Sequence, residues 1–265
     1  MINKCITIED LQLSDKNLVK RIGQYGIYYR GEDNDSFFRS EIFRYIKLSY
    51  FFSMMDESIL YIPNRKSFTD LRDKIGMGKY IPKYKYDFKI KPIDAWKDRK
   101  WRKELQEEKN AAMDVCISCW TKDTQMYGRC EESFLMWKAY SDSKELVCRI
   151  GTSVQLLLDS IIELPCDFVI SKVEYTKEND HSLNGLLFNK TMYYSTEHEV
   201  RLVALSRGKD HMSLRIDPYK LVQNVKTSPF IPPLIENAVI EALKRKYVNL
   251  KDKIGPSEVM EYPHV

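Results

Sequence analysis

The sequence predicts an α+β fold in one domain that spans residues 1–265. Short strand patterns are scattered along the chain and do not alternate with helices in regular βαβ units. The composition, 43% hydrophobic and 30% charged, supplies a core and is not typical of a disordered chain. One amphipathic helix is clear, because apolar residues recur at helical spacing over 234–247 behind Pro232-Pro233, an acceptable helix opening.

The other elements are expected in the following order. Strand patterns occur at 27–30, 58–62, 114–120, 146–151, 168–175 and 199–205, and helix patterns at 104–113 and 133–140. The aromatic segment 37–55 fits either a helix or a strand, because its period is ambiguous. Residues 64–78 have the composition of a loop and a short polar helix.

The sequence argues against membrane and secreted proteins. The longest apolar stretch, 154–162, is interrupted by Asp159 and is far shorter than the roughly 20 residues that span a bilayer. Residues 1–10 lack the basic-then-apolar pattern of a secretory signal. We therefore expect a cytoplasmic protein without a membrane partner, whose six cysteines are reduced thiols.

A pair of carboxylates is the first candidate for chemistry. In the run Glu197-His198-Glu199-Val200-Arg201, strand alternation would place both glutamates on one face and His198 on the other. Two clustered carboxylates keep a proton on one of them or need a cation nearby, and they suit the stabilisation of a developing positive charge. The alternative is a solvated edge strand in which Glu199 pairs with a neighbouring base.

Arginines beside aromatic rings are the second candidate. Arg44 precedes Tyr45, and Arg30 follows two tyrosines. An arginine in such a setting can hold a phosphate while the ring stacks on a planar group. Aromatic residues at this density are equally typical of a core.

A metal site is not expected. Cys116 and Cys119 have the spacing of a zinc-binding pair, but no second pair follows, and free cysteines are common in cores. The chain also lacks the serine-hydrolase, phosphate-loop, dinucleotide-glycine and zincin patterns.

The segment 79–103 is predicted to be a basic aromatic insertion. It contains ten Lys or Arg residues and six aromatic residues. Positive charge and stackable rings together suit the binding of single-stranded nucleic acid, and a docking surface for a protein partner such as an antitoxin is the alternative. The candidate nucleic-acid-binding residues are Lys83, Lys85, Tyr86, Lys89, Lys91, Trp96, Arg99, Trp101 and Arg102.

Several motifs follow one another between residues 42 and 250. They are Phe43-Arg44-Tyr45, the loop from 60–63 to 68–73, Ser118-Cys119-Trp120-Thr121, Leu135-Met136-Trp137-Lys138-Ala139-Tyr140-Ser141, Val173-Glu174-Tyr175 and the Glu-x-Glu-x-Arg run at 197–201. In this order they resemble the motifs of a widespread bacterial domain family, whose segment order is in turn similar to that of ADP-ribosyltransferases. The chain departs from the family pattern at Thr69, Leu71, Glu145 and Val200.

The resemblance implies a fold and a set of site residues. The fold would be a split, mixed β-sheet pair with surrounding helices, which clamps NAD as a substrate in a central cleft. Glu199 would stabilise the oxocarbenium-like ribose through a ribose hydroxyl, and Glu197 would orient or deprotonate the acceptor. Arg44, with Arg30 as its rival, would hold the pyrophosphate or ribose. The remaining cofactor-binding candidates are Tyr45, Trp137 and Tyr140, which would stack on nicotinamide or shape its pocket, and Ser118 on the central strand.

The implied function is NAD-dependent ADP-ribosylation of a macromolecule by a bacterial toxin or anti-phage defence effector. The basic segment favours RNA or DNA over protein as the acceptor. The substitutions Thr69 and Val200 keep a second hypothesis open, a non-catalytic module that binds nucleic acid or a partner. A third is a magnesium-dependent nuclease that uses Asp70, Asp73 and the two late glutamates.

Overall fold

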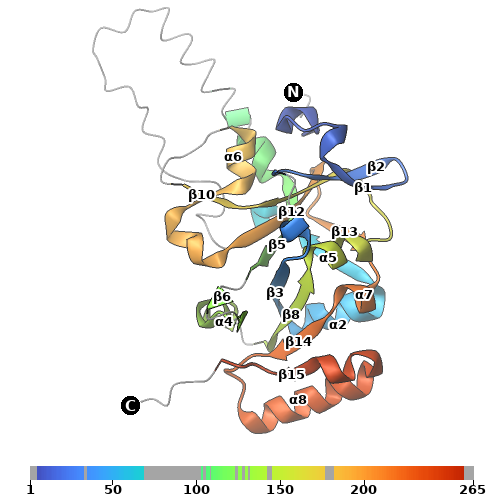
Figure 1. Ribbon diagram of the computed structural model, residues 1–265, viewed down its shortest axis with the longest axis vertical. Helices are drawn as coiled ribbons and strands as arrows, with labels where there is room; N and C mark the ends of the chain where they lie inside the picture. Colours follow the sequence, from blue (N-terminus) through green and yellow to red (C-terminus); the bar gives the residue numbers. More distant parts are fainter. Residues whose placement is uncertain are drawn as a thin grey trace, which may run out of the picture.

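A nine-stranded mixed sheet forms the centre of the molecule (Figure 1). The computed structural model describes residues 5–32, 35–68, 103, 106–107, 109–122, 125–126, 129–130, 132–141, 145–176 and 182–259. In the order in which they lie in the sheet, the strands are β1 (Leu18–Ile22), β2 (Tyr25–Tyr29), β9 (Phe168–Lys172), β12 (Glu199–Arg207), β5 (Val115–Thr121), β3 (Glu41–Lys47), β8 (Val147–Ser153), β14 (Asn224–Thr227) and β15 (Ile254–Pro256).

Helices, short 3-10 turns and three small two-stranded sheets surround this sheet. The helices are α1 (Asp35–Phe38), α2 (Leu48–Glu57), α4 (Phe134–Ser141), α5 (Val154–Ser160), α6 (Leu183–Phe188), α7 (Pro218–Leu221) and α8 (Pro233–Lys246). The 3-10 turns are η1 (Glu9–Leu11), η2 (Asp15–Asn17), η3 (Arg65–Ser67), η4 (Met192–Glu197) and η5 (Val248–Lys253). The small sheets pair β4 (Ile59–Pro63) with β13 (His211–Arg215), β6 (Gln125–Met126) with β7 (Arg129–Cys130), and β10 (Glu174–Thr176) with β11 (Asn189–Thr191).

The sheet narrows between β3 and β5. These two strands share a single paired position, Phe43 with Thr121. In contrast, β5 pairs with β12 along its whole length, and β3 pairs with β8 from Glu41 to Lys47. The sheet therefore consists of two well-paired parts, β1-β2-β9-β12-β5 and β3-β8-β14-β15, that join at one residue pair.

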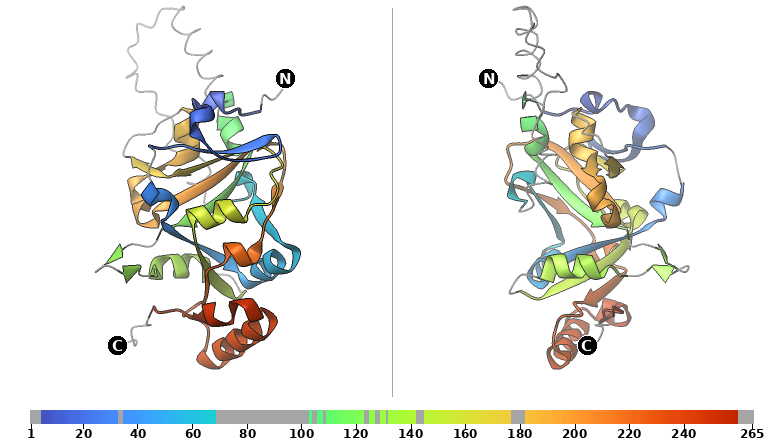
Figure 2. Two further views of the ribbon diagram at one scale, coloured as in Figure 1. Left: turned by 45° about the vertical axis from the view of Figure 1, so that its right-hand side comes forward. Right: turned by 90° about the vertical axis from the view of Figure 1, so that its left-hand side faces the viewer.

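Both faces of the sheet are covered. On one face, Ile42, Trp120 and Leu202 belong to a large core completed by α2, α5, α7 and α8, and Figure 2 shows α5 and α7 over that face. On the other face, Ile117 and Val203 pack under the N-terminal segment and α6. Because alternate residues of a strand face opposite sides, β2, β9, β12 and β5 each contribute to both cores. The second face of β3 and β8 instead packs Tyr45 and Val147 against Trp137 in a third, small cluster.

The structure confirms a mixed α and β architecture, and most predicted elements lie within a few residues of their expected positions. The ambiguous segment 37–55 contains both a strand, β3, and a helix, α2. The prediction of one strand over 168–175 is wrong, because the chain leaves the large sheet after Lys172 and forms β10 beside β11. No helix in the described part of the chain is long and apolar enough to span a membrane.

Candidate active site

The two glutamates lie where the chain enters β12. Glu197 is the last residue of η4, and His198 adopts a left-handed conformation (φ 42°, ψ 49°) that turns the chain into the strand at Glu199. The Thr121 hydroxyl donates to the carbonyl oxygen of Glu197, and the backbone N–H of Lys122 donates to that of His198 at 3.0 Å. The turn is thus anchored to the end of β5.

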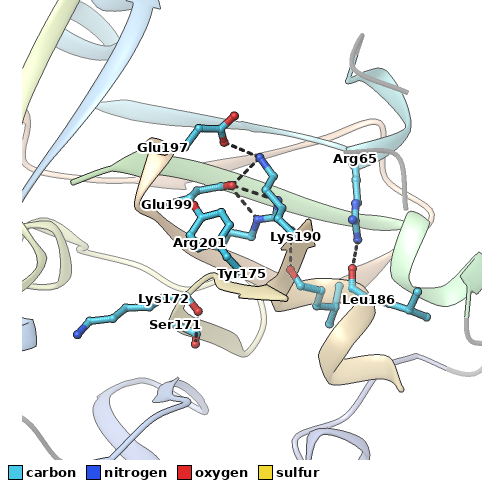
Figure 3. Close-up of polar contacts among 10 residues, drawn as sticks. Arg65, Ser171, Lys172, Tyr175, Leu186, Lys190, Glu197, Glu199 and Arg201 are labelled. Atoms are coloured by element: carbon cyan, nitrogen blue, oxygen red, sulfur yellow. Dashed lines mark hydrogen bonds and ion pairs between the residues drawn. The ribbon is translucent and has the colours of Figure 1, made fainter. Parts of the chain in front are cut away.

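A single ammonium group joins the two carboxylates (Figure 3). The Lys190 Nζ atom lies 2.7 Å from Oε2 of Glu197 and 2.8 Å from Oε2 of Glu199. Simple strand alternation was the wrong reason to expect the two side chains together, because Glu197 precedes the strand and the left-handed His198 separates the two glutamates. They meet because both reach Lys190, which β11 presents from outside the large sheet.

A second cation, Arg201, binds Glu199 from the same strand. Its Nε and Nη2 atoms donate to Oε1 and Oε2 of Glu199 at 2.8 and 3.2 Å. Arg201 is fully buried and Glu199 is 4% exposed. Burial alone would raise the pKa of Glu199, but Arg201 and Lys190 outweigh it and hold that pKa below its ordinary value. Glu199 is therefore ionised at neutral pH.

Buried arginines also hold the segment that carries Lys190. Arg201 Nη1 donates to the Leu187 carbonyl at 2.7 Å, and Arg65 Nη1 donates to the Leu186 carbonyl at 2.6 Å (Figure 3). Both carbonyls belong to α6, which leads directly into β11. The backbone N–H of Glu199 donates to the Tyr175 hydroxyl, 2.9 Å away on the neighbouring β10.

Tyr140 lies within electrostatic reach of both carboxylates and of Arg44. Burial of its hydroxyl raises the pKa of Tyr140, Glu199 and Glu197 raise it further, and Arg44 lowers it. Tyr140 is 44% exposed. Arg44 is half-buried, and its Nη2 donates to the Tyr61 carbonyl at 3.3 Å. Of the predicted site residues, Tyr140 therefore lies near Arg44 and near both glutamates.

Three other predicted residues are buried. Ser118 is fully buried, and its hydroxyl accepts a hydrogen bond from Trp120 Nε1 at 3.0 Å. Tyr45 is 3% exposed and Trp137 is fully buried, and their rings pack edge to face with centroids 4.8 Å apart. The structure does not bring these side chains to the surface beside the carboxylates, because strand alternation and the packing of α4 turn them into the cores.

The structure separates the two rival arginines. Arg30 Nη1 lies 3.0 Å from Oε1 of Glu174, and its guanidinium lies 5.4 Å from the centre of the Phe188 ring. The strand β2, which Arg30 follows, and β3, which carries Arg44, are each two strands from β12 in the sheet. Arg44 acts on the pKa of Tyr140 together with both glutamates, whereas Arg30 does not contribute to it.

The two cysteines with zinc-like spacing are divided between the two cores. Cys116 and Cys119 face opposite sides of β5, because they are three residues apart in a strand: Cys116 packs in the large core and Cys119 against the other one. Across the described residues, no three His, Cys, Asp or Glu side chains gather as a metal site would require. Asp70 and Asp73 lie outside these residues, as do all nine of the candidate nucleic-acid-binding residues.

The sequence did not single out Lys190. It lies in a three-residue strand with no motif around it, so only the fold brings it to the carboxylates. Tyr175 and Arg201 were noted as parts of motifs, without their contacts to Glu199. Comparisons of the chain with protein-family models, with curated proteins and with solved structures find no match.

Proposed function

We propose that the protein is an NAD-dependent ADP-ribosyltransferase that modifies a macromolecule, with RNA or DNA favoured as the acceptor. The observation that carries the proposal is the pair of carboxylates, Glu197 and an ionised Glu199, which Lys190 joins, with Tyr140 near both of them and near Arg44. The resemblance expects an arginine on the first core strand and a Glu-x-Glu pair near a late strand. The neighbouring strands β3, β5 and β12 agree with a split, mixed sheet, because β3 joins β5 at a single residue pair.

The proposed reaction uses the two carboxylates differently. The bond between the ribose C1′ and nicotinamide breaks, its electron pair leaves with nicotinamide, and positive charge develops on the ribose. An ionised Glu199 that accepts a hydrogen bond from a ribose hydroxyl stabilises this state more than the ground state. Glu197, whose side chain is 24% exposed, takes the proton of the acceptor nucleophile as that nucleophile attacks C1′.

Arg44 and Tyr140 would bind the substrate in this reaction. A guanidinium suits the pyrophosphate of NAD, since it donates in pairs to phosphate oxygens. Tyr140 is exposed enough to contact a nicotinamide ring, whereas Tyr45 and Trp137 would support it from the core beneath. A toxin or defence role, and an antitoxin partner, rest on the family resemblance. The preference for nucleic acid rests on the composition of segment 79–103.

A second candidate is a non-catalytic module of the same fold that binds nucleic acid or a partner. The observation that favours it is the burial of Glu199. Its ion pairs with Arg201 and Lys190 are also typical of a carboxylate that only stabilises the fold. The nuclease hypothesis has less support, because the two late glutamates pair with Lys190 and Arg201.

Nicotinamide release tests the proposal. The purified protein is incubated with NAD alone and with total RNA, denatured DNA or cell protein, and each pool is examined by mass spectrometry for added ADP-ribose. We expect release and labelling that are lost in Glu197→Gln and Arg44→Lys and kept in Glu163→Gln, a matched change at an exposed glutamate elsewhere. No release from folded protein, with no rise of its melting temperature in NAD, would favour the non-catalytic module.

A further inference from the structure

A cavity of about 580 Å³ lies apart from the candidate active site. The N-terminal turns η1 and η2 form one side, and residues of β2, the end of β12 and the approach to β9 form the other. Neither glutamate of the candidate site lines it, nor do Arg44, Tyr140 or Lys190. Its size is within the range of about 300–1,000 Å³ that is typical of small-molecule sites.

The cavity combines apolar walls with carboxylates. Ile6, Ile8 and Leu13 are buried residues of the core on this face of the sheet, and they also line the cavity. Glu9 and Asp15 come from the two turns, and Asp167 precedes β9. No lysine or arginine is among the described lining residues. The lining is therefore acidic in a chain whose net charge is +4.

Tyr28 adds a hydroxyl to this lining. The residue is only 7% exposed, and within the described part of the chain its hydroxyl makes no hydrogen bond. Burial raises the pKa of Tyr28, Asp167, Asp15 and Glu9 raise it further, and Arg21 lowers it. The hydroxyl is not among the fully buried polar atoms without a partner, so it stays accessible from the cavity and can accept a hydrogen bond from a ligand there.

The carboxylates keep room for further donors. Oδ1 of Asp167 accepts the backbone N–H of Gly26 at 2.7 Å. Oδ1 of Asp15 lies 3.6 Å from Arg21 Nη2, and both of these side chains are at least half exposed. A carboxylate accepts up to about four hydrogen bonds, so these contacts leave most of the accepting capacity unused.

We propose that this cavity binds an aliphatic polyamine. Ammonium groups donate to the carboxylates, which stand on three separate elements, and to the lone pairs of the Tyr28 hydroxyl. The methylene groups between the ammonium groups pack against Ile6, Ile8 and Leu13, as the stem of a lysine does on an apolar surface. This site goes beyond the proposed transferase and does not depend on it.

Calorimetric titration of the full chain with spermidine at physiological salt tests this proposal. We expect one saturable site. Tyr28→Phe removes only the hydroxyl and should weaken binding roughly threefold to tenfold. Asp167→Asn removes the charge while its side-chain oxygen can still accept from Gly26, and it should weaken binding by about tenfold or more. The matched control is Asp252→Asn in η5, which follows α8 at the opposite end of the molecule from η1 (Figure 1).

Three outcomes would overturn the polyamine site. The first is that spermidine gives no saturable heat with folded wild-type protein and leaves its melting temperature unchanged. The second is an equal loss in Asp252→Asn and Asp167→Asn, which would show a nonspecific charge effect. The third is displacement of spermidine by magnesium at the same concentration of positive charge, which would show a counterion site without shape selection. Nicotinamide release plays no part in these measurements, so their failure leaves the transferase proposal untouched.

Discussion

Lys190 holds its ammonium nitrogen 2.8 Å from a carboxylate oxygen of Glu199, in a place where the two side chains are 10% and 4% exposed. A buried charge is costly unless it is paired. With Glu197 and Arg201, the cluster contains two carboxylates and two cations, and its charges balance. This balance leads to the first two predictions.

Replacement of Lys190 should alter the titration of Glu199. Lys190 is one of the two cations that hold the pKa of Glu199 below its ordinary value, so Lys190→Met should raise that pKa. Carbon-13 NMR of the glutamate carboxyl groups measures the change. In the pH profile of the rate of nicotinamide release, the fall on the acid side should move to higher pH. Lys190→Arg keeps the charge and serves as the control. An unchanged titration in Lys190→Met would show that Arg201 alone sets the ionisation.

Loss of the Glu199 charge should destabilise the fold. Glu199→Gln leaves Arg201 buried without its counter-charge, and breaking such a pair costs about 3–5 kcal/mol of the free energy of unfolding. The folded pKa lies below the ordinary value of 4.5, so the contribution of Glu199 is complete above that pH and is lost as the pH falls toward the folded value. In urea unfolding, the difference in the free energy of unfolding between wild type and variant should therefore be large at pH 7 and should decrease below pH 4.5. A difference that does not depend on pH would contradict an ionised Glu199.

Glu132 should be a further stabilising residue outside the candidate site. Its carboxylate lies 3.2 Å from Arg149 Nη1, and it accepts hydrogen bonds from Trp137 Nε1 at 2.9 Å and the Ser257 hydroxyl at 2.5 Å. Glu132 thereby ties the C-terminal segment to β8 and α4. The Arg149 and Glu132 side chains are both 4% exposed. Glu132→Ala should cost about 3–5 kcal/mol in urea unfolding, whereas Ser257→Ala should cost only about 1 kcal/mol. Equal losses would assign the stabilisation to the C-terminal segment alone.

The cysteines should differ in reactivity. Burial raises the pKa of Cys116 to about 11 and of Cys166 to about 12, and it raises the pKa of Cys148 as well. Cys5 is exposed. Because the thiolate is the reactive form, maleimide at pH 7.5 should label Cys5 well before Cys116, Cys148 and Cys166. Peptide mass mapping measures the order, and all six cysteines should react in guanidinium chloride. Rapid native labelling of Cys148 would contradict its burial.

The sequence by itself determined the local elements. Helical spacing behind Pro232-Pro233 predicted α8, and short apolar runs predicted β5, β8 and β12 close to their observed bounds. These features depend on neighbours within a few residues, which is why a linear pattern contains them. The same patterns placed Glu197 and Glu199 at the start of a strand and Arg44 in an aromatic segment that could be read as strand or helix.

Only the tertiary structure decided which of these residues meet. Strand alternation tells which residues share a face, but the order of strands in the sheet depends on contacts between distant segments. The small β10–β11 sheet brought Lys190 to both carboxylates, and the order of strands in the large sheet separated Arg30 from Arg44. The tertiary structure also placed Ser118, Tyr45 and Trp137 in the cores, because each faces a packed layer that its own sequence neighbours do not reveal. The cavity beside Tyr28 likewise exists only where the N-terminal turns fold back on the sheet.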